Sequence, residues 1–214
     1  MNIALIGATG FVGSAVLHEL LQRGHRVTAL ARDPARLAPR AGLAVVQADA
    51  QDAAQVARAV AGHEAVVSAY NPGWDNPRIH DEFLRGTRAI IDGTRQAGLR
   101  RILVVGGAGS LFVAPGVQLV DTPEFPAEWK QGALAAREAL NLIRQEEALE
   151  WTFLSPPILL EPGERTGRYR RGQDAPLMEA DGRPGGISVA DLAVALVDEL
   201  EAPRHVCQRF TVAR

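Results

Sequence analysis

The chain has 214 residues, of which 47% are hydrophobic, and this is enough to bury the core of one domain. Its 23 basic and 25 acidic residues give a formal net charge of −2, which argues against nucleic-acid and anionic-membrane partners. No segment approaches the ~20 apolar residues of a membrane span, and the start MNIALIGATG lacks the features of a secretory signal. We therefore expect a single cytoplasmic domain, residues 1–214, that acts on a small molecule.

Apolar runs typical of strands alternate with helix-like segments along most of the chain. Strands are expected at 2–6, 26–31, 43–47, 64–69, 100–105, 150–155 and 208–212, and helices at 11–23, 52–60, 80–97, 131–148 and 188–200. This alternation predicts an α/β fold with a doubly wound parallel sheet. The stretch 156–186 is rich in proline and glycine and breaks the pattern, so we interpret it as an irregular excursion on the substrate side.

A glycine-rich turn joins the first strand to the first helix. Gly7 permits a tight turn, Gly10 lets backbone N–H groups approach a pyrophosphate, and Gly13 lets the helix pack closely on the sheet. The G-x-x-G-x-x-G spacing favours the short-chain or extended dehydrogenases among the dinucleotide-binding folds. The predicted cofactor contacts in this turn are Gly7, Thr9, Gly10, Phe11, Val12 and Gly13.

The residues after the second and third strands bear on the choice of cofactor. Arg32 follows the second strand directly, and its guanidinium can grip the 2′-phosphate of NADP. Asp33, which precedes Pro34, is typical of a helix N-cap, although it could bond the ribose of NAD instead. NADP(H) is therefore favoured and NAD(H) is the alternative. Asp49 is expected beside the adenine, and capping of helix 52–60 is an equal and compatible role.

Two further strand ends are candidates for the cofactor site, because ligands of open α/β sheets bind at the carboxyl ends of the strands. The fourth strand leads into a turn signal, Asn71-Pro72-Gly73, and the sixth ends in a proline pair that equally marks a plain strand terminator. The predicted contacts are Ala69, Tyr70, Asn71, Ser155 and Pro156.

Several of these motifs together resemble a known family. They are Gly7-Ala8-Thr9-Gly10, Arg32-Asp33-Pro34, the run Val104 to Ser110, the run Trp151 to Pro156, the segment Pro162 to Gly167, and Gln208 to Val212. Over essentially the whole chain they are similar to atypical short-chain dehydrogenases described as NADH–flavin reductases, with biliverdin-IXβ/flavin reductase and NmrA-like proteins as relatives. The resemblance implies a Rossmann fold and an NAD(P)H-dependent reductase, with FMN or FAD as candidate substrate. A non-catalytic NADP-binding redox sensor of the NmrA type is the alternative.

The resemblance also bears on the catalytic group. Ser110 corresponds to the serine that the wider superfamily places beside the nicotinamide and the substrate. The alternative is that Ser110 is an ordinary turn residue without a catalytic role. The Tyr-x-x-x-Lys pair of ordinary short-chain dehydrogenases is missing, because neither Tyr70 nor Tyr169 has a lysine four residues on and Trp129 precedes the only lysine, Lys130. This absence disfavours carbonyl reduction and fits flavin reduction, in which water can supply the proton.

A basic run at 164–171 is the last candidate ligand-binding feature. Arg165, which belongs to the family-like Gly-Glu-Arg-Thr-Gly segment, and Tyr169, which could stack on a planar ring, are the predicted substrate contacts. The alternative is that this basic run forms a hairpin exposed to solvent and binds no ligand. The five histidines have no metal-ligand spacing, so no metal is expected, and the single cysteine, Cys207, is interpreted as a small buried apolar residue.

Overall fold

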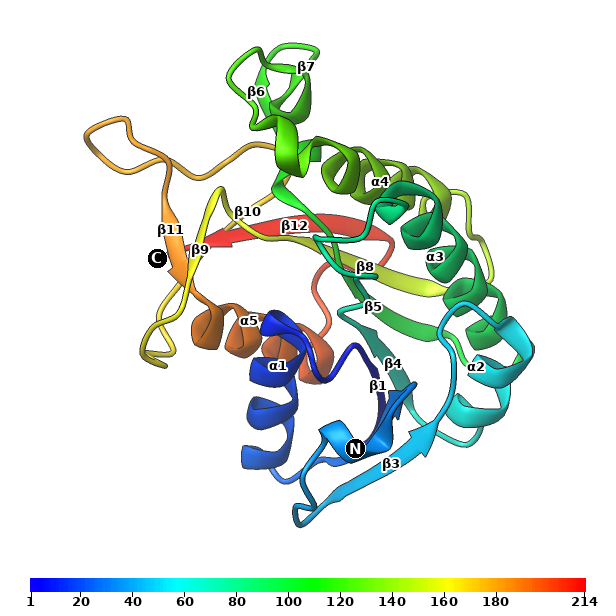
Figure 1. Ribbon diagram of the computed structural model, residues 1–214. Helices are drawn as coiled ribbons and strands as arrows, with labels where there is room; N and C mark the ends of the chain where they lie inside the picture. The colour runs from blue at the N-terminus through cyan, green and yellow to red at the C-terminus, as the bar shows by residue number, and fades with distance from the viewer.

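The computed structural model describes all residues from 1 to 214 and places one large sheet between two layers of helices (Figure 1). Seven strands run parallel in the order β3-β2-β1-β4-β5-β8-β12, and β10 pairs antiparallel with β12 at the edge. The seven are β1 (Asn2–Ile6), β2 (Arg26–Ala31), β3 (Leu43–Gln47), β4 (Ala65–Ser68), β5 (Arg101–Val105), β8 (Glu150–Ser155) and β12 (Gln208–Ala213). The predicted doubly wound α/β fold is therefore confirmed.

The helices cover both faces of this sheet. Helices α1 (Phe11–Gln22) and α5 (Val189–Glu201) pack together on one face, and α2 (Ala53–Val60), α3 (Ile79–Gln96) and α4 (Ala127–Ile143) on the other (Figure 1). Because successive side chains of a strand point to opposite faces, Leu5 enters the core beneath α1 and α5 while Ile6 enters the core beneath α2 to α4. The covered central strands consequently consist almost entirely of apolar residues.

Helix α4 and the short strands differ from the sequence-based expectation. Helix α4 begins at Ala127, four residues earlier than predicted, because Pro126 supplies its extended N-cap, and it ends at Ile143, five residues earlier than predicted. The chain also forms a hairpin of β6 (Phe112–Ala114) and β7 (Val117–Gln118), which projects beyond α4 in Figure 1. Strands this short carry no detectable periodicity in the sequence.

The excursion at 156–186 is more regular than expected. It contains β9 (Leu159–Glu161), the edge strand β10 (Arg170–Gly172) and the first residue of β11 (Gly186–Ser188), and β9 pairs parallel with β11. Its 162–169 segment is fixed to the first turn of α5, where the buried carboxylate of Asp191 accepts hydrogen bonds from the N–H groups of Thr166 and Gly167 and from the Thr166 hydroxyl.

Two local assignments are confirmed and one is wrong. The Ser188 hydroxyl accepts a bond from the N–H of Asp191 and caps α5, and the Asp33 carboxylate caps a short 3₁₀ turn at Pro34–Arg36. Cys207 was expected to be buried, but it is exposed and has a positive φ of 55° in the turn before β12. None of the helices combines the length and the apolar character that crossing a membrane requires.

Candidate functional site

The carboxyl ends of the parallel strands meet at one edge of the sheet, and β1 lies there between β2 and β4. The chain leaves β1 toward α1 on one face, whereas the connection after β4 leads to α3 on the other face. Such a switch in direction opens a crevice at the strand ends, which is where doubly wound sheets bind ligands. The candidate site therefore lies above β1 and β4.

The glycine turn after β1 is shaped by backbone contacts that exclude side chains. Gly7 has a positive φ of 85°, and a Cβ atom there would lie 2.4 Å from the backbone oxygen of Ala69. A Cβ atom on Gly13 would lie 1.9 Å from the backbone oxygen of Gly7. The turn, the start of α1 and the end of β4 thus pack backbone against backbone, which only glycine allows.

Gly10 is different, because its Cβ position is open. A Cβ atom there would meet only the Gly7 oxygen, at 3.4 Å, and Gly10 has ordinary extended φ and ψ values. The N–H groups of Phe11 and Val12 donate to no protein atom, no side chain caps α1, and no acidic residue lies in its first turn. The open space beside unpaired amides at a positive helix end fits a pyrophosphate.

Arg32 and Asp33 have separate roles after β2. Arg32 is exposed and takes part in one hydrogen bond, in which its backbone carbonyl accepts from the Gln47 side chain, so its guanidinium forms no ion pair. The carboxylate of Asp33 accepts a hydrogen bond from the N–H of Ala35 at 3.1 Å. The cation beside the strand end is therefore free for a ligand phosphate, while the anion is already engaged in the turn.

Tyr70 and Asp49 approach the same crevice from β4 and β3. The Tyr70 ring lies against Gly86 of α3, and its hydroxyl donates to the backbone carbonyl of Glu82 at 3.2 Å. Burial raises the pKa of the Tyr70 phenol, and the nearby Asp49 carboxylate acts in the same direction. Asp49 accepts from the N–H of Gln51, whereas the cap of α2 is Asp52, so the predicted capping role of Asp49 is wrong. The phenol at this edge is neutral and is held in place.

The Asn71 side chain, which follows Tyr70, is engaged in a turn. The Asn71 side chain accepts from the N–H of Gly73 at 2.8 Å, as in an Asx turn. Ala69 contributes its backbone to the wall against Gly7. The 69–71 segment therefore borders the turn through main-chain groups.

The ends of β5 and β8 form the neighbouring part of the edge. Gly106 is pressed against the Phe153 ring, which would lie 2.0 Å from an added Cβ atom, and the N–H of Gly107 has no acceptor in the protein. The Ser155 hydroxyl at the end of β8 is fully buried and has no hydrogen-bond partner, and Pro156 follows it without an N–H group. Both segments border the crevice with few side-chain atoms.

Ser110 does not have the exposed position expected of a catalytic group. Only 2% of it is exposed, and its hydroxyl and backbone carbonyl both accept hydrogen bonds from the guanidinium of Arg209, at 3.0 and 2.9 Å. Arg209 in turn binds the carboxylate of Asp174. The sequence did contain a signal for this cluster, since Arg209 is the one charged residue within the apolar β12 strand.

Arg165 and Tyr169, the predicted substrate contacts, have hydrogen-bond partners within the protein. Arg165 donates two hydrogen bonds to the buried carboxylate of Glu19, at 2.7 and 2.8 Å, and this holds the pKa of Glu19 below its usual value. The Tyr169 hydroxyl donates to Asp198 at 2.5 Å, and burial together with that carboxylate raises the pKa of Tyr169 to about 12. Glu19 lies six residues beyond Gly13, the last glycine of the turn, and this network fastens the excursion to α1 and α5.

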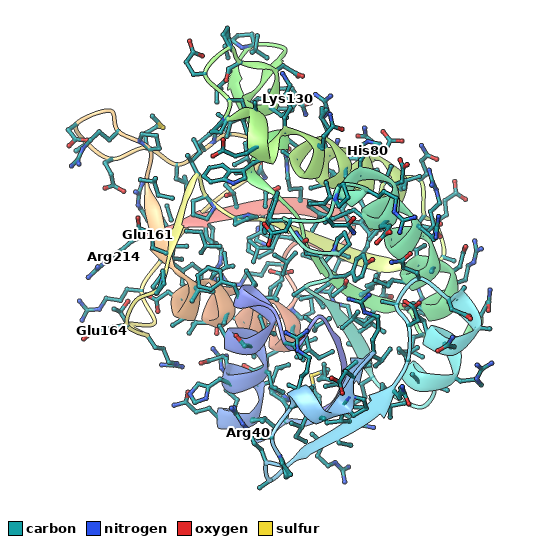
Figure 2. All side chains as sticks on the ribbon, viewed as in Figure 1. Arg40, His80, Lys130, Glu161, Glu164 and Arg214 are labelled. Carbon is teal, nitrogen blue, oxygen red and sulfur yellow. The ribbon has the colours of Figure 1, made fainter.

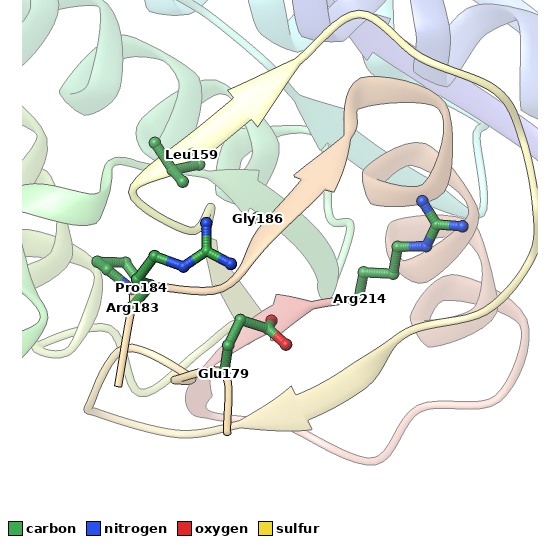
Figure 3. Close-up of a pocket in the computed structure, with 6 residues that line it drawn as sticks. All are labelled: Leu159, Glu179, Arg183, Pro184, Gly186 and Arg214. Carbon is green, nitrogen blue, oxygen red and sulfur yellow. The ribbon is translucent and has the colours of Figure 1, made fainter. Parts of the chain in front are cut away.

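Two hollows lie around β9 and β11. One has a volume of about 390 Å³ and is lined by Leu159, Glu179, Arg183, Pro184, Gly186 and Arg214 (Figure 3). The other, of about 450 Å³, shares Leu159, Gly186 and Arg214 with it and extends toward Glu161 and Glu164, which Figure 2 labels. Glu179 already pairs with Arg170, and Arg183 pairs with Asp181. Neither hollow includes a residue of the glycine turn.

Histidine, cysteine and carboxylate side chains form no group of three or more that could hold a metal ion. The groups that border the crevice are backbone amides, the Arg32 guanidinium and the Tyr70 hydroxyl.

Comparison with known proteins agrees with this geometry. A family model described as NAD(P)H-binding matches residues 7–203. Uncharacterized protein YwnB of Bacillus subtilis (strain 168) is 40% identical over 99% of this chain and 98% of its own. Among solved structures, a candidate epimerase from Bacteroides thetaiotaomicron is 44% identical with a TM-score of 0.92, covering 99% of this chain and 96% of that one.

A candidate NADH-flavin reductase from Streptococcus pneumoniae is 32% identical with a TM-score of 0.85, covering 100% of this chain and 99% of that one. The sequence resemblance is thereby confirmed at the level of the family. The glycine turn, the switch point above β1 and β4 and the family match lead to one conclusion: the chain belongs to the NAD(P)H-binding family of Rossmann-fold proteins.

Proposed function

We propose that this protein transfers a hydride from NADPH to a flavin or a similar planar acceptor. The observation that carries the proposal is the free guanidinium of Arg32 beside an open phosphate turn, while Asp33 is engaged in capping. NADPH, when bound, supplies a hydride, that is two electrons and one proton, and solvent supplies the second proton that completes the reduced flavin.

The residues of the crevice would divide the work of binding. The amides at the start of α1 hold the pyrophosphate, and Arg32 pairs with the 2′-phosphate. The nicotinamide then lies toward the ends of β5 and β8, where the free N–H of Gly107 and the backbone around Ser155 and Pro156 orient it. Orientation of two rings accounts for most of what a hydride transfer needs from a protein.

The side chains available for proton transfer favour a flavin over a simple carbonyl. Both tyrosine hydroxyls donate to protein acceptors, and the pKa of each phenol is raised. Lys130 is exposed at the start of α4 (Figure 2), and it follows Trp129 and not a tyrosine. A carbonyl acceptor needs a positioned acid, whereas the reduced isoalloxazine delocalises its charge and takes a proton from water.

Two exposed tryptophans support a planar acceptor. Trp74, in the loop after β4, is 57% exposed, and Trp129, in the first turn of α4, is 52% exposed. The Trp74 ring lies against Gly132, which is one helical turn beyond Trp129. A Cβ atom on Gly132 would lie only 2.5 Å from this ring. Trp74 follows the end of β4, and an exposed indole can stack on a flat ring. The candidate NADH-flavin reductase among the similar structures is consistent with this choice.

The test mixes purified protein with NADPH and FMN, FAD or riboflavin and follows the absorbance of the nicotinamide band. We expect oxidation with at least one flavin, a weaker reaction with NADH, and none with simple aldehydes. Lys130→Ala should retain activity, which serves as the control for a hidden proton relay. NADPH binding without oxidation by any flavin would contradict the reductase and favour the redox sensor, and aldehyde reduction that Lys130→Ala abolishes would restore a carbonyl reductase.

A further inference from the structure

A buried arginine of β12 ties the loop at the end of β5 to the excursion. The side chain of Arg209 is 1% exposed, and hydrogen bonds account for all five of its N–H groups. Every acceptor belongs either to Ser110 or to Asp174. Since a buried guanidinium needs both charge compensation and full hydrogen bonding, these two residues determine where it can lie.

Asp174 lies in the connection between β10 and β11, far from Ser110 in the sequence. Its carboxylate is the only one on the Arg209 guanidinium, and its backbone carbonyl accepts from the N–H of Phe112 at 2.8 Å. A second arginine, Arg144, approaches the same carboxylate oxygen at 3.8 Å. The excursion and the residues after β5 are thus joined both by a main-chain bond and through Arg209.

Loop 106–110 has little freedom apart from this link. Gly106 is pressed against Phe153, and Cβ atoms on Gly107 and Gly109 would lie 3.2 and 3.0 Å from alanine side chains of α4. Packing therefore fixes one side of the loop, and the bonds from Arg209 to Ser110 fix its far end. The N–H of Gly107, which has no acceptor in the protein, lies between these two supports in the loop that follows β5.

We infer that Asp174 is a positioning residue, which acts through Arg209 and Ser110 to hold loop 106–110 against the nicotinamide half of the cofactor. This inference rests on the proposed function, because it takes loop 106–110 as the nicotinamide side of the site. Asp174 touches neither cofactor nor acceptor. Through Arg209 it links the excursion to the geometry of the cofactor site.

The test compares two probes, NADPH and 2′,5′-ADP, which keeps the adenine end and the 2′-phosphate but lacks the nicotinamide. In Asp174→Asn the affinity for NADPH should fall roughly three- to tenfold, as for one lost hydrogen bond, while the affinity for 2′,5′-ADP stays within about twofold. Asp181→Asn is the matched control, because it removes a carboxylate paired only with Arg183 in the same excursion. It should change neither affinity.

A second variant separates positioning from stability. Arg209→Met combined with Asp174→Leu replaces the charge pair by apolar side chains, which generally preserves folding. This protein should melt near the parent temperature yet lose NADPH affinity selectively. A parental ratio of the two affinities in either variant would overturn the inference. If the selective loss occurs but the parent protein oxidises NADPH with no flavin, the proposed reaction fails and the positioning role stands.

Discussion

The open Cβ position of Gly10 makes a sharp prediction for Gly10→Val. The residue has ordinary extended backbone angles, and an added Cβ atom would meet only the Gly7 oxygen at 3.4 Å. The fold should therefore tolerate valine, with a change in the free energy of unfolding of less than about 1 kcal/mol. The branched side chain would instead fill the space through which a pyrophosphate reaches the amides of Phe11 and Val12.

The expected loss of binding follows from those amides. Each hydrogen bond from an amide to a charged phosphate is worth about 1.5–3 kcal/mol, and valine would keep the pyrophosphate from at least two of them. NADPH binding should weaken by at least about 3 kcal/mol, which corresponds to more than 100-fold in Kd. Titration calorimetry measures this loss, and circular dichroism during heating measures stability.

The control for this prediction is His18→Val. It places the same branched side chain on an exposed position of α1, five residues beyond Gly13, and should leave NADPH binding unchanged. If Gly10→Val is folded and binds NADPH as tightly as the parent, the turn does not hold the pyrophosphate. If it fails to fold, the open space inferred at Gly10 is wrong.

Three other substitutions test the neighbouring contacts. Gly13→Ala would normally favour a helix by about 1 kcal/mol, but the clash with a backbone oxygen should reverse the sign and lower stability by about 2 kcal/mol, measured by urea unfolding; equal stability would refute the close packing. Arg32→Ala should weaken NADPH by about 1.5–3 kcal/mol and NADH hardly at all in calorimetry, and equal losses would show that Arg32 does not bind the 2′-phosphate. Arg165→Ala should leave NADPH binding unchanged but cost about 1 kcal/mol of stability, discounted because Arg165 is partly exposed. Arg165 lowers the pKa of Glu19, so the stability difference between the parent and Arg165→Ala should depend on pH. It should be full at neutral pH, above the ordinary carboxyl pKa of 4.5, and it should disappear as the pH falls through the lower pKa of Glu19 in the folded protein. A stability difference that persists at lower pH would contradict the ion pair.

Local patterns predicted the sheet and the turn, because both depend on residues close together in the sequence. The run 2–6 and the glycines at 7, 10 and 13 need only their neighbours to specify a strand, a turn and a helix start. Arg165 and Ser110 could not be placed in this way. Their partners, Glu19 and Arg209, lie 146 and 99 residues away along the chain. Only the folded topology brings these groups together.

Arginines with a structural role differ from Arg32, the proposed ligand-binding arginine, in whether a carboxylate of the protein pairs with them. Arg23 pairs with three carboxylates, and Arg165 and Arg209 each bind one, so their charges are already compensated inside the protein. Arg32 lies at the edge of the crevice with no carboxylate, although Asp33 is its neighbour in the chain. A cation that the fold leaves unpaired beside a phosphate turn stays available to an anionic ligand. The charge in the basic run 164–171 suggested a ligand site, but Arg165 and Arg170 in this run pair with Glu19 and Glu179, so charge density in the sequence does not by itself identify a ligand-binding arginine.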